Sequence, residues 1–226
     1  MFFPDRIKNI KPTDRVLEIG PGADPHPRSD VFLEIKLDNP KEYKEQFGHD
    51  RKLSTDKQVV FYDGKIFPFK DGEFDYIICS HVLEHVEDVK GFLSELFRVG
   101  KGGYIEYPLV YYEYLYNFDV HLNYLKFDGT VLRYMKKSAS HLNEFKPVQN
   151  FFYESLKGGH VAVLNELISL FMEGFEWKCK FIVEEVNDVS KVCHVNCEVP
   201  KAKVDHSHTP SAVELTKQLI RKVIKR

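Results

Sequence analysis

The fold is decided by the stretch V-L-E-I-G-P-G, which runs from Val16 to Gly22. Its first four residues have the character of a short strand that is buried on both faces, as in a parallel sheet. Gly20 and Gly22 permit backbone angles and close approaches that a Cβ atom would prevent, and Pro21 stiffens the turn between them. Such a turn presents backbone N–H groups at the carboxyl edge of a sheet, where open α/β folds bind ligands. An ordinary structural turn gives the same pattern, so other stretches must decide between the two.

Length and composition indicate one sizeable core. The chain has 226 residues, of which 43% are hydrophobic, which suits one domain with an addition. A formal charge of −2 and a pI near 6.6 argue against a nucleic-acid-binding protein, which needs a clearly basic face. No apolar run reaches the roughly 18 residues needed to cross a bilayer, and the N-terminus lacks a signal-peptide pattern. We therefore expect a cytoplasmic protein.

The four cysteines form neither a secretory nor a metal-binding pattern. Cys79 lies in an apolar run and no CxxC pair occurs, which favours a reduced, cytoplasmic protein. Cys193, His194 and Cys197 belong to V-C-H-V-N-C-E-V, which alternates like a strand, so neighbouring candidate ligands would point to opposite faces. We therefore assign no metal-binding residues from the sequence.

Strands and helices alternate along the first half of the chain. The loop A-D-P-H-P-R-S-D after the glycine turn holds two prolines, which leave little room for a regular helix before the strand V-F-L-E-I (31–35). Further strands are predicted at 59–62, F-D-Y-I-I-C (74–79) and Y-I-E-Y-P (104–108). Helical apolar spacing begins at Val82, and the charged segment before the third strand suits one helix and a loop. This order indicates a parallel α/β sheet.

Acidic residues stand where these strands end. Glu34 lies near the carboxyl end of the second strand, where a carboxylate can accept hydrogen bonds from two neighbouring ribose hydroxyls. Asp38 is the alternative, because strand ends are uncertain by a few residues. Asp63 and Gly64 follow the third strand at the same edge, where a side-chain oxygen can bind the exocyclic amine of a purine. An ordinary Asp-Gly turn has the same sequence.

Several of these motifs, in this order over residues 14–108, resemble a known family. V-L-E-I-G-P-G, then P-F-K-D-G-E-F-D-Y-I-I-C-S-H-V-L-E-H-V-E-D, then E-L-F-R-V-G-K-G-G are similar to class I S-adenosylmethionine-dependent methyltransferases of the methyltransferase type 11-like branch. The proline loop departs from the commoner pattern, in which Asp24 would be a third glycine and a helix would follow. It resembles a variant found in some cell-surface glycan methyltransferases. The resemblance implies a Rossmann-like, seven-stranded, mostly parallel sheet with an antiparallel edge strand and flanking helices.

The same resemblance implies a cofactor site. The cofactor is S-adenosyl-L-methionine and the product is S-adenosyl-L-homocysteine. Glu34 matches the ribose-binding acid, and Asp63 with Gly64 matches the pair beside the adenine. Because the first helix is truncated, Arg28 is a candidate replacement for contacts to the cofactor carboxylate. The residues that match the surroundings of the methionine moiety and the substrate mouth are Glu18, Gly20, Pro21, Gly22, Ser80 and His81.

Residues 109–158 form an aromatic-rich insertion between the fifth strand and a helix predicted around 161–171. Seven tyrosines occur from Tyr104 to Tyr124, both included, in strand five and the start of the insertion. In this fold such an insertion overhangs the carboxyl edge of the sheet, and tyrosine offers an apolar face and a polar end for hydroxyl recognition. We expect a cap that recognises a sugar or another polyol. A satellite hydrophobic cluster or a dimer contact is the alternative.

Methyl transfer to a hydroxyl requires a base within hydrogen-bond reach of the acceptor. Histidine suits this role because its ordinary pKa of about 6.5 leaves it largely neutral at pH 7. The candidates are His81, His85 and His121, with Glu106 as a fourth, and our hypothesis is that His81 or His121 is the base. Two histidines four residues apart on one helix can equally serve capping or packing.

The end of the chain is predicted to close the sheet. W-K-C-K-F-I-V-E-E-V (177–186) and V-C-H-V-N-C-E-V (192–199) alternate like an antiparallel pair at the sheet edge, so residues 1–200 would form the methyltransferase domain. Residues 201–226 would be a linker and a basic amphipathic helix that begins at Thr209. Such a helix can lie on an anionic membrane, bind a partner or a second copy, or dock on its own domain.

Together these features predict a cytoplasmic S-adenosylmethionine-dependent methyltransferase that methylates an acceptor hydroxyl. The acceptor would be a small molecule or a glycan, such as a sugar of a surface polysaccharide, and not a nucleic acid. A small-molecule or protein N-methyltransferase is the alternative enzyme, and a non-catalytic cofactor-binding protein is the alternative outside enzymes. A nicotinamide-dependent oxidoreductase is disfavoured because the glycine pattern is incomplete. The metal requirement stays open, and membrane contact through the C-terminal helix would place the protein at the inner membrane surface.

Overall fold

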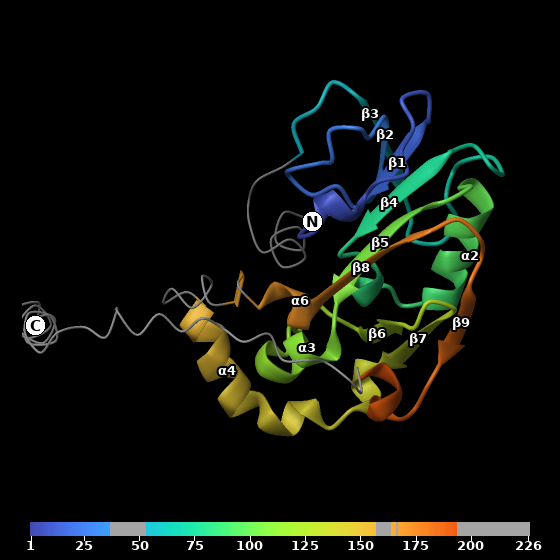
Figure 1. Cartoon of the computed structure of the whole chain (residues 1–226). Coiled ribbons are helices and arrows are strands. Elements are labelled where there is room, and N and C mark those ends of the chain that lie inside the picture. Colours follow the sequence, from blue (N-terminus) through green and yellow to red (C-terminus); the bar gives the residue numbers. More distant parts are fainter. Residues whose placement is uncertain (37–52, 157–163, 166, 194–226) are drawn as a thin grey trace, which may run out of the picture.

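A six-stranded sheet is the main element of the computed structural model, which describes residues 1–36, 53–156, 164–165 and 167–193 (Figure 1). Its strands are β1 (Val16–Ile19), β2 (Val31–Ile35), β3 (Gln58–Tyr62), β4 (Tyr76–Ser80), β5 (Gly103–Pro108) and β8 (Met172–Trp177). Their order is β3-β2-β1-β4-β5-β8. The first five are parallel, and β8 pairs antiparallel with β5. The predicted mostly parallel sheet with an antiparallel edge strand is confirmed, with six strands among the described residues instead of seven.

The central strands are apolar because both of their faces are covered. Every residue of β1 and β5 is buried, whereas β3 at the edge of the sheet alternates between half-buried and exposed positions. One face of the sheet packs on α2 (Val89–Val99), which contributes five buried apolar side chains spaced by three and four residues, namely Val89, Phe92, Leu93, Leu96 and Val99. Continuous apolar runs therefore mark the strands, and helical spacing marks the helix.

The helix that follows β4 begins later than the sequence predicts. Apolar spacing starts at Val82, but residues Leu83–His85 form a separate 3-10 turn, η2, before α2 begins at Val89. Asp88 sets this start by accepting a hydrogen bond from the N–H of Gly91 at 2.9 Å, which satisfies a backbone donor that the first turn leaves free.

A distant side chain keeps η2 apart from α2. The amide nitrogen of Asn123 donates to the carbonyl oxygens of Leu83, at 3.0 Å, and Val86, at 2.7 Å. A continuous helix would use these two oxygens for its own backbone bonds. The apolar spacing that begins at Val82 therefore marks the buried side of two separate elements, η2 and α2, and not of one continuous helix.

The connection between β1 and β2 contains no helix, as its prolines predict. It is held instead by the buried carboxylate of Glu18, which accepts hydrogen bonds from the N–H of His26 at 2.9 Å and the hydroxyl of Ser29 at 2.6 Å. The loop thus obtains from one side chain the order that a helix would otherwise supply.

A second sheet is built largely from the insertion. Its strands are β6 (Asn123–Phe127), β7 (Val131–Lys136) and β9 (Ile182–Glu185), in the order β6-β7-β9, and β9 runs parallel to β7. The expectation that residues 177–186 extend the large sheet is therefore wrong beyond Trp177. The free edge of β5 is already filled by β8, from Gly103 opposite Trp177 to Pro108 opposite Met172, so the following strand pairs elsewhere.

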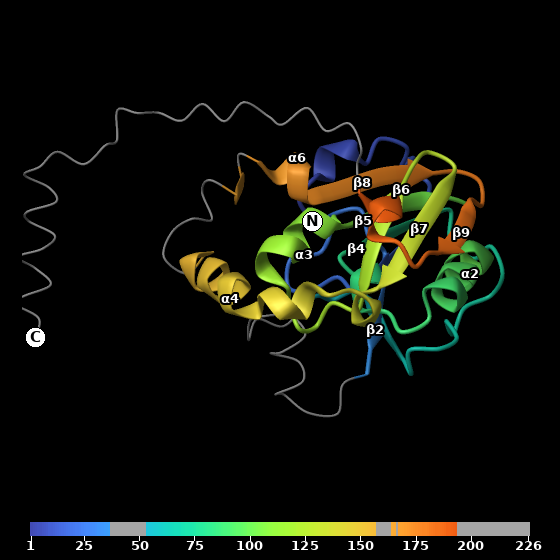
Figure 2. The same ribbon diagram turned by 90° about the horizontal axis from the view of Figure 1, so that it is seen from below.

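The later part of the described chain also contains the α-helices α3 (Val110–Tyr116), α4 (Lys146–Ser155) and α6 (Ile168–Phe171). Short 3-10 helices lie at Pro4–Arg6, Lys137–Ala139, Leu142–Phe145 and Val189–Val192. In both views α3 lies between α4 and the small sheet (Figures 1 and 2). The helix predicted around 161–171 is thus found in its last residues, since 157–163 and 166 lie outside the described residues. Within the described residues no helix has both the length and the apolar character to cross a bilayer. The predictions for Asp38, Cys197 and the C-terminal helix fall on undescribed residues. Most of the helix and loop predicted over residues 39–58 does so too, and the described residues 53–58 contain no helix.

Candidate functional site

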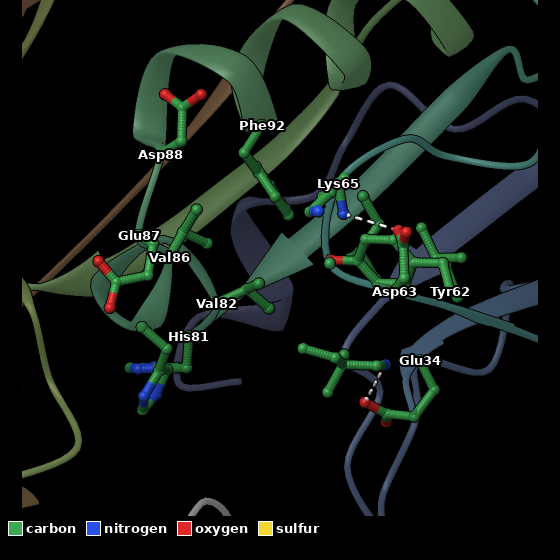
Figure 3. A pocket seen from close by; sticks show the side chains of 16 residues that line it. Glu34, Tyr62, Asp63, Lys65, His81, Val82, Val86, Glu87, Asp88 and Phe92 are labelled. Carbon is green, nitrogen blue, oxygen red and sulfur yellow. Dashed lines mark hydrogen bonds between the residues drawn. The ribbon is translucent and has the colours of Figure 1, made fainter. Parts of the chain in front are cut away.

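A cavity of about 670 Å³ lies at the carboxyl ends of the central strands. Strand β1 is flanked by β2 on one side and β4 on the other, and such a reversal of strand order is where open α/β sheets bind ligands. Of the predicted cofactor residues, the cavity is lined by Gly20, Glu34, Asp63, Gly64 and His81. Glu34 and Asp63 lie on one wall, and His81 lies on the other (Figure 3).

Gly20 makes the turn that opens this cavity. Its φ of +61° lies in the left-handed region, and a Cβ atom at this position would come within 2.7 Å of Cγ2 of Val82. The N–H of Gly20 donates to the carbonyl oxygen of Leu33 at 2.9 Å, which ties the turn to β2. Both the backbone angle and the close approach of Val82 therefore require glycine at position 20.

Two acidic side chains, predicted to bind the nucleoside, lie at the ends of β2 and β3. Oε1 of Glu34 accepts a hydrogen bond from the N–H of Ile35 at 2.9 Å, and burial raises the pKa of this carboxyl to about 7. Oδ1 of Asp63 accepts from the N–H of Lys65 at 3.1 Å, and Gly64 between them adopts a φ of +85°. These two acids leave carboxylate oxygens at the cavity wall.

Five predicted cofactor residues lie outside the lining of this cavity: Glu18, Pro21, Gly22, Arg28 and Ser80. Glu18 holds the proline loop, and burial raises the pKa of its carboxyl to about 7. The guanidinium of Arg28 donates to the carbonyl oxygens of Lys11 at 2.9 Å and Pro12 at 3.4 Å. The expectation that Arg28 replaces a contact to the cofactor carboxylate is thus corrected, because this side chain is used to anchor the loop.

Glu106 is a fully buried hub, a role that the sequence does not reveal. Its carboxylate accepts five hydrogen bonds, from the N–H groups of Phe2 (2.7 Å) and Phe3 (3.0 Å), the hydroxyls of Ser80 (2.9 Å) and Tyr104 (2.7 Å), and Nε2 of His81 (3.1 Å). Burial raises the pKa of Glu106, but the bond from His81 and the other donors bring it below its usual value. Glu106 therefore joins the N-terminal segment to β4 and β5 and has no free oxygen to act as a base.

His81 is held by carboxylates on both of its ring nitrogens. Nδ1 lies 3.1 Å from Oε1 of Glu84, and Nε2 lies 3.1 Å from Oε1 of Glu106. Its backbone is left-handed, with φ of 57°, and the ring of Phe2 contacts its ring edge to face at 5.2 Å. Burial lowers the pKa of His81, but the two carboxylates raise it above its usual value. Since neither ring nitrogen is available to take a proton, the hypothesis that His81 is the base is corrected.

A second cavity, of about 850 Å³, lies beside the first and shares His81 and His85 with it. Aromatic side chains of the insertion line this second cavity, together with His121 and the N-terminal Phe2; they are Tyr112, Tyr116, Phe118 and Tyr153. The insertion thus supplies one wall of a chamber that adjoins the predicted cofactor cavity.

The rings of His85 and His121 contact each other edge to face at this boundary, with ring centroids 4.8 Å apart. Nδ1 of His85 donates to the carbonyl oxygen of Val120 at 3.0 Å, and burial lowers the pKa of His85. Nδ1 of His121 lies 2.5 Å from Oε1 of Glu113. In both rings Nδ1 is already used in a hydrogen bond, so Nε2 is the ring atom that could take another partner.

Glu113 orients His121 and is itself held by a lysine. Oε2 of Glu113 accepts from Nζ of Lys137 at 2.8 Å, and the Glu113 carboxylate is almost fully buried, with 1% of the residue exposed. The sequence offers one signal for this residue, because Glu113 is the single charged residue in V-Y-Y-E-Y-L-Y, the segment that forms α3. The pairing with Lys137 has no local sequence signal.

Residues 35–105 match the model of a methyltransferase domain family. This segment belongs to the class I methyltransferases. The match contains the β4 strand, the η2 turn and α2, whose motifs carried the predicted resemblance, and the prediction of this family is confirmed. S-adenosyl-L-methionine, the predicted cofactor, is the cofactor of the family.

Individual proteins and solved structures are also similar to part of this chain. An uncharacterized protein of Methanocaldococcus jannaschii is 32% identical over 99 residues, which are 44% of this chain and 45% of that protein. The chain therefore spans about half the length of the curated relative that it matches. Similar solved structures include a possible histamine N-methyltransferase of Thermotoga maritima, with 24% identity, 47% and 49% coverage of the two chains and a TM-score of 0.32. Another is the N-terminal domain of EvdMO1 with S-adenosylhomocysteine bound, with 20% identity, 43% and 44% coverage and a TM-score of 0.30.

The residues of the first cavity suit the cofactor of this family. Its volume of about 670 Å³ lies within the range of small-ligand sites. Glu34 offers a carboxylate at the end of β2, which is where an acid holds the ribose in other open α/β sheets, and Asp63 offers another at the end of β3. The Cβ-free backbone of Gly20 permits close approach of a ligand.

Proposed function

We propose that this protein is a methyltransferase that uses S-adenosyl-L-methionine to methylate a hydroxyl of a small-molecule or glycan acceptor, such as a sugar of a surface polysaccharide. The observation that carries the proposal is the meeting of two cavities at His81 and His85. One cavity has the acids that suit a nucleoside, and the other has aromatic walls that suit a polyol. A methyl donor and an acceptor placed in them would meet at their common boundary.

The cofactor is assigned to the first cavity. Glu34 binds the ribose hydroxyls, Asp63 with Gly64 lies beside the adenine, and Gly20 lies near the methionine moiety. Bound there, S-adenosyl-L-methionine supplies the methyl group from its sulfonium and leaves as S-adenosyl-L-homocysteine. Glu18 and Arg28 act on this site indirectly, because both hold the loop that follows the glycine turn.

The acceptor is assigned to the second cavity, with residues 109–158 as its cap. The tyrosine rings offer stacking faces, and Lys146 and Asn150 add polar groups to the same lining. This composition favours a polyhydroxylated acceptor over a fully apolar one. The division into a domain of residues 1–200 and a C-terminal extension of residues 201–226 belongs to the same proposal.

Activation of the acceptor is assigned to His85 and His121. A hydroxyl needs to lose its proton as it attacks, and an imidazole held through Nδ1 by a carboxylate or a carbonyl oxygen presents Nε2 for that purpose. The carboxylate of Glu113 holds His121 in this way. An N-methyltransferase that acts on a neutral amine needs less of this assistance, so the oriented pair favours oxygen as the acceptor atom.

The proposal is tested by calorimetry and by a panel of acceptors. The full chain should bind both S-adenosyl-L-methionine and S-adenosyl-L-homocysteine, and it should form S-adenosyl-L-homocysteine faster with sugars than with matched amino sugars methylated at nitrogen. Binding without turnover on any hydroxylated acceptor, together with turnover on amines, would assign the alternative activity. Binding of neither compound would indicate a non-catalytic scaffold.

A further inference from the structure

Three side chains of metal-binding type meet at the boundary of the two cavities. One carboxylate oxygen of Glu84 and one ring nitrogen each of His85 and His121 all lie within 4.8 Å of one another. We infer that Glu84, His85 and His121 bind a divalent transition-metal ion of the Zn²⁺ type. Two imidazoles and one carboxylate are a ligand set that zinc and related ions use where coordination positions stay open.

The hydrogen bonds of the two histidines support this assignment. In metal sites a ligating histidine donates its second ring N–H to a carboxylate or a carbonyl oxygen, which fixes the tautomer and the ring orientation. Nδ1 of His121 lies 2.5 Å from the Glu113 carboxylate, and Nδ1 of His85 lies 3.0 Å from the carbonyl oxygen of Val120. Both rings are therefore held from behind, and both Nε2 atoms are left for an ion.

The carboxylate of Glu84 supplies an independent observation. The residue is 0% exposed, and its Oε2 atom has no hydrogen-bond partner within the described part of the chain. Its other oxygen, Oε1, lies 3.1 Å from Nδ1 of His81 and 4.0 Å from Nε2 of His85. A buried carboxylate oxygen without a partner is costly, and a cation between Glu84 and the two imidazoles would satisfy it.

The backbone fixes these ligands before any ion binds. Glu84 and His85 are neighbours in η2, and the N–H of Leu122, next to His121, donates to the carbonyl oxygen of Glu84 at 2.6 Å. Asn123 holds the carbonyl of Leu83, the first residue of η2, and that of Val86, which follows η2. The segment that follows β4 and the insertion are thus joined by backbone and side-chain hydrogen bonds at the place where the three ligand atoms meet.

The ion would act on the acceptor, a role that rests on the proposed function. Three protein ligands leave positions open, and both Glu84 and His121 line the aromatic cavity. A hydroxyl oxygen that completes the coordination becomes more acidic, because a bound divalent cation lowers the pKa of its ligand. Its proton passes to solvent water, and the oxygen is left beside the cofactor cavity. With the ion bound, His85 and His121 would act through Nε2 as its ligands, and this role would replace the direct proton transfer to Nε2 in the proposed function.

The experiment measures metal binding directly, without turnover. Untagged full-length protein is freed of metal with a chelator and titrated with Zn²⁺ by calorimetry and with Co²⁺ by visible absorption. We expect one equivalent with a spectrum of nitrogen and oxygen ligands. H85A, H121A and E84Q should each weaken Zn²⁺ binding at least about tenfold. H141A is the matched control, because His141 forms an exposed pair with Glu144 at 2.9 Å, and it should bind as the wild type does.

Three results would overturn the inference. The first is that wild-type protein takes up no equivalent of either ion, and the second is that H121A binds as tightly as wild type. The third is that Co²⁺ gives a thiolate charge-transfer band, which would place the ion on cysteines. A rise in the unfolding temperature of wild type with Zn²⁺ is expected in addition, so the test survives if a variant fails to fold. Binding of S-adenosyl-L-homocysteine to the metal-free protein is measured in parallel. If it persists while metal binding is absent, the inference fails, whereas the assignment of the cofactor to the first cavity is unaffected and the acceptor panel still decides the proposed function.

Discussion

A side chain of one carbon at Gly20 would collide with Val82, because its Cβ atom would lie 2.7 Å from Cγ2 of that residue. The glycine turn after β1 and the segment after β4 are therefore packed directly on each other, although they are far apart in the sequence. Both residues line the cavity proposed for the cofactor, so this contact forms part of its wall.

Replacement of Gly20 should therefore cost more than replacement of another left-handed glycine. Gly72 has φ of +62° and open space around its Cα, whereas Gly20 has φ of +61° and the Val82 contact. G72A should lower the free energy of unfolding by about 1 kcal/mol from backbone strain, and G20A should lower it by about 2–4 kcal/mol because overpacking adds to the strain. Urea denaturation checks both values. Equal losses for the two variants would contradict the importance of the Val82 contact.

Cofactor affinity should depend on pH through Glu34. Burial raises the pKa of its carboxyl to about 7, and only the ionised form accepts hydrogen bonds from both ribose hydroxyls at once. Protonation competes with binding, so affinity should be constant above about pH 8 and should fall by up to about tenfold per pH unit below pH 7. Calorimetric titration with S-adenosyl-L-homocysteine between pH 5.5 and 8.5 measures this.

E34Q separates Glu34 from other titrating groups. It should bind about 10–100-fold more weakly at pH 8, since each lost bond to a charged acceptor is worth about 1.5–3 kcal/mol, partly regained by the amide oxygen. Its affinity should change little across the same pH range. E18Q is the comparison, because Glu18 also has a pKa near 7 but lies outside the cavity lining. If E34Q keeps the full pH dependence, another group is responsible.

The Glu113–His121 pair should affect turnover more than cofactor binding. E113Q leaves His121 in place but removes the charge that orients it, so kcat should fall by about 100-fold or more, with affinity for S-adenosyl-L-homocysteine within about twofold of wild type. E144Q is the matched control, because Glu144 holds the exposed His141 in a similar pair. If E113Q kept the wild-type kcat, the proposal that His121 takes part in acceptor activation would be contradicted.

The hub at Glu106 should contribute to stability. E106Q replaces an oxygen that accepts from several donors by an NH₂ group that faces them, so two or more donors lose their partner. The free energy of unfolding should fall by about 2–4 kcal/mol. Chemical denaturation checks it, with E73Q as the control, because Glu73 forms its ion pair with Arg15 at the surface. A loss below about 0.5 kcal/mol would show that water replaces the lost partners.

The five parallel strands and the site at their ends could be predicted from the sequence because these features are local. A strand covered on both faces is mostly apolar, and a left-handed turn that packs closely on another segment favours glycine, so V-L-E-I-G-P-G indicates both the strand and the cavity. Glu34 and Asp63 follow because strand ends in a parallel sheet share one edge. The prolines likewise predict the irregular first connection.

The features that were missed depend on contacts between distant residues. The start of α2 is set in part by Asn123, which no pattern around Val82 reveals. The strand β9 joins the small sheet because β8 already fills the edge of β5. His81 has the residue type of a base, but Glu84 and Glu106 occupy both of its ring nitrogens. Composition gives the type of a side chain, and only the fold gives its partners.

The N-terminal segment has a practical consequence for handling the protein. The N–H groups of Phe2 and Phe3 are bound by Glu106, and the Phe2 ring lies against His81 in the wall of the cavity proposed for the acceptor. Residues of an affinity tag fused ahead of Met1 would be joined to this wall by a single residue, so they would shield the cavity or pull Phe2 away from it. A removable tag at the other end of the chain would leave the contacts of Phe2 in this wall unchanged.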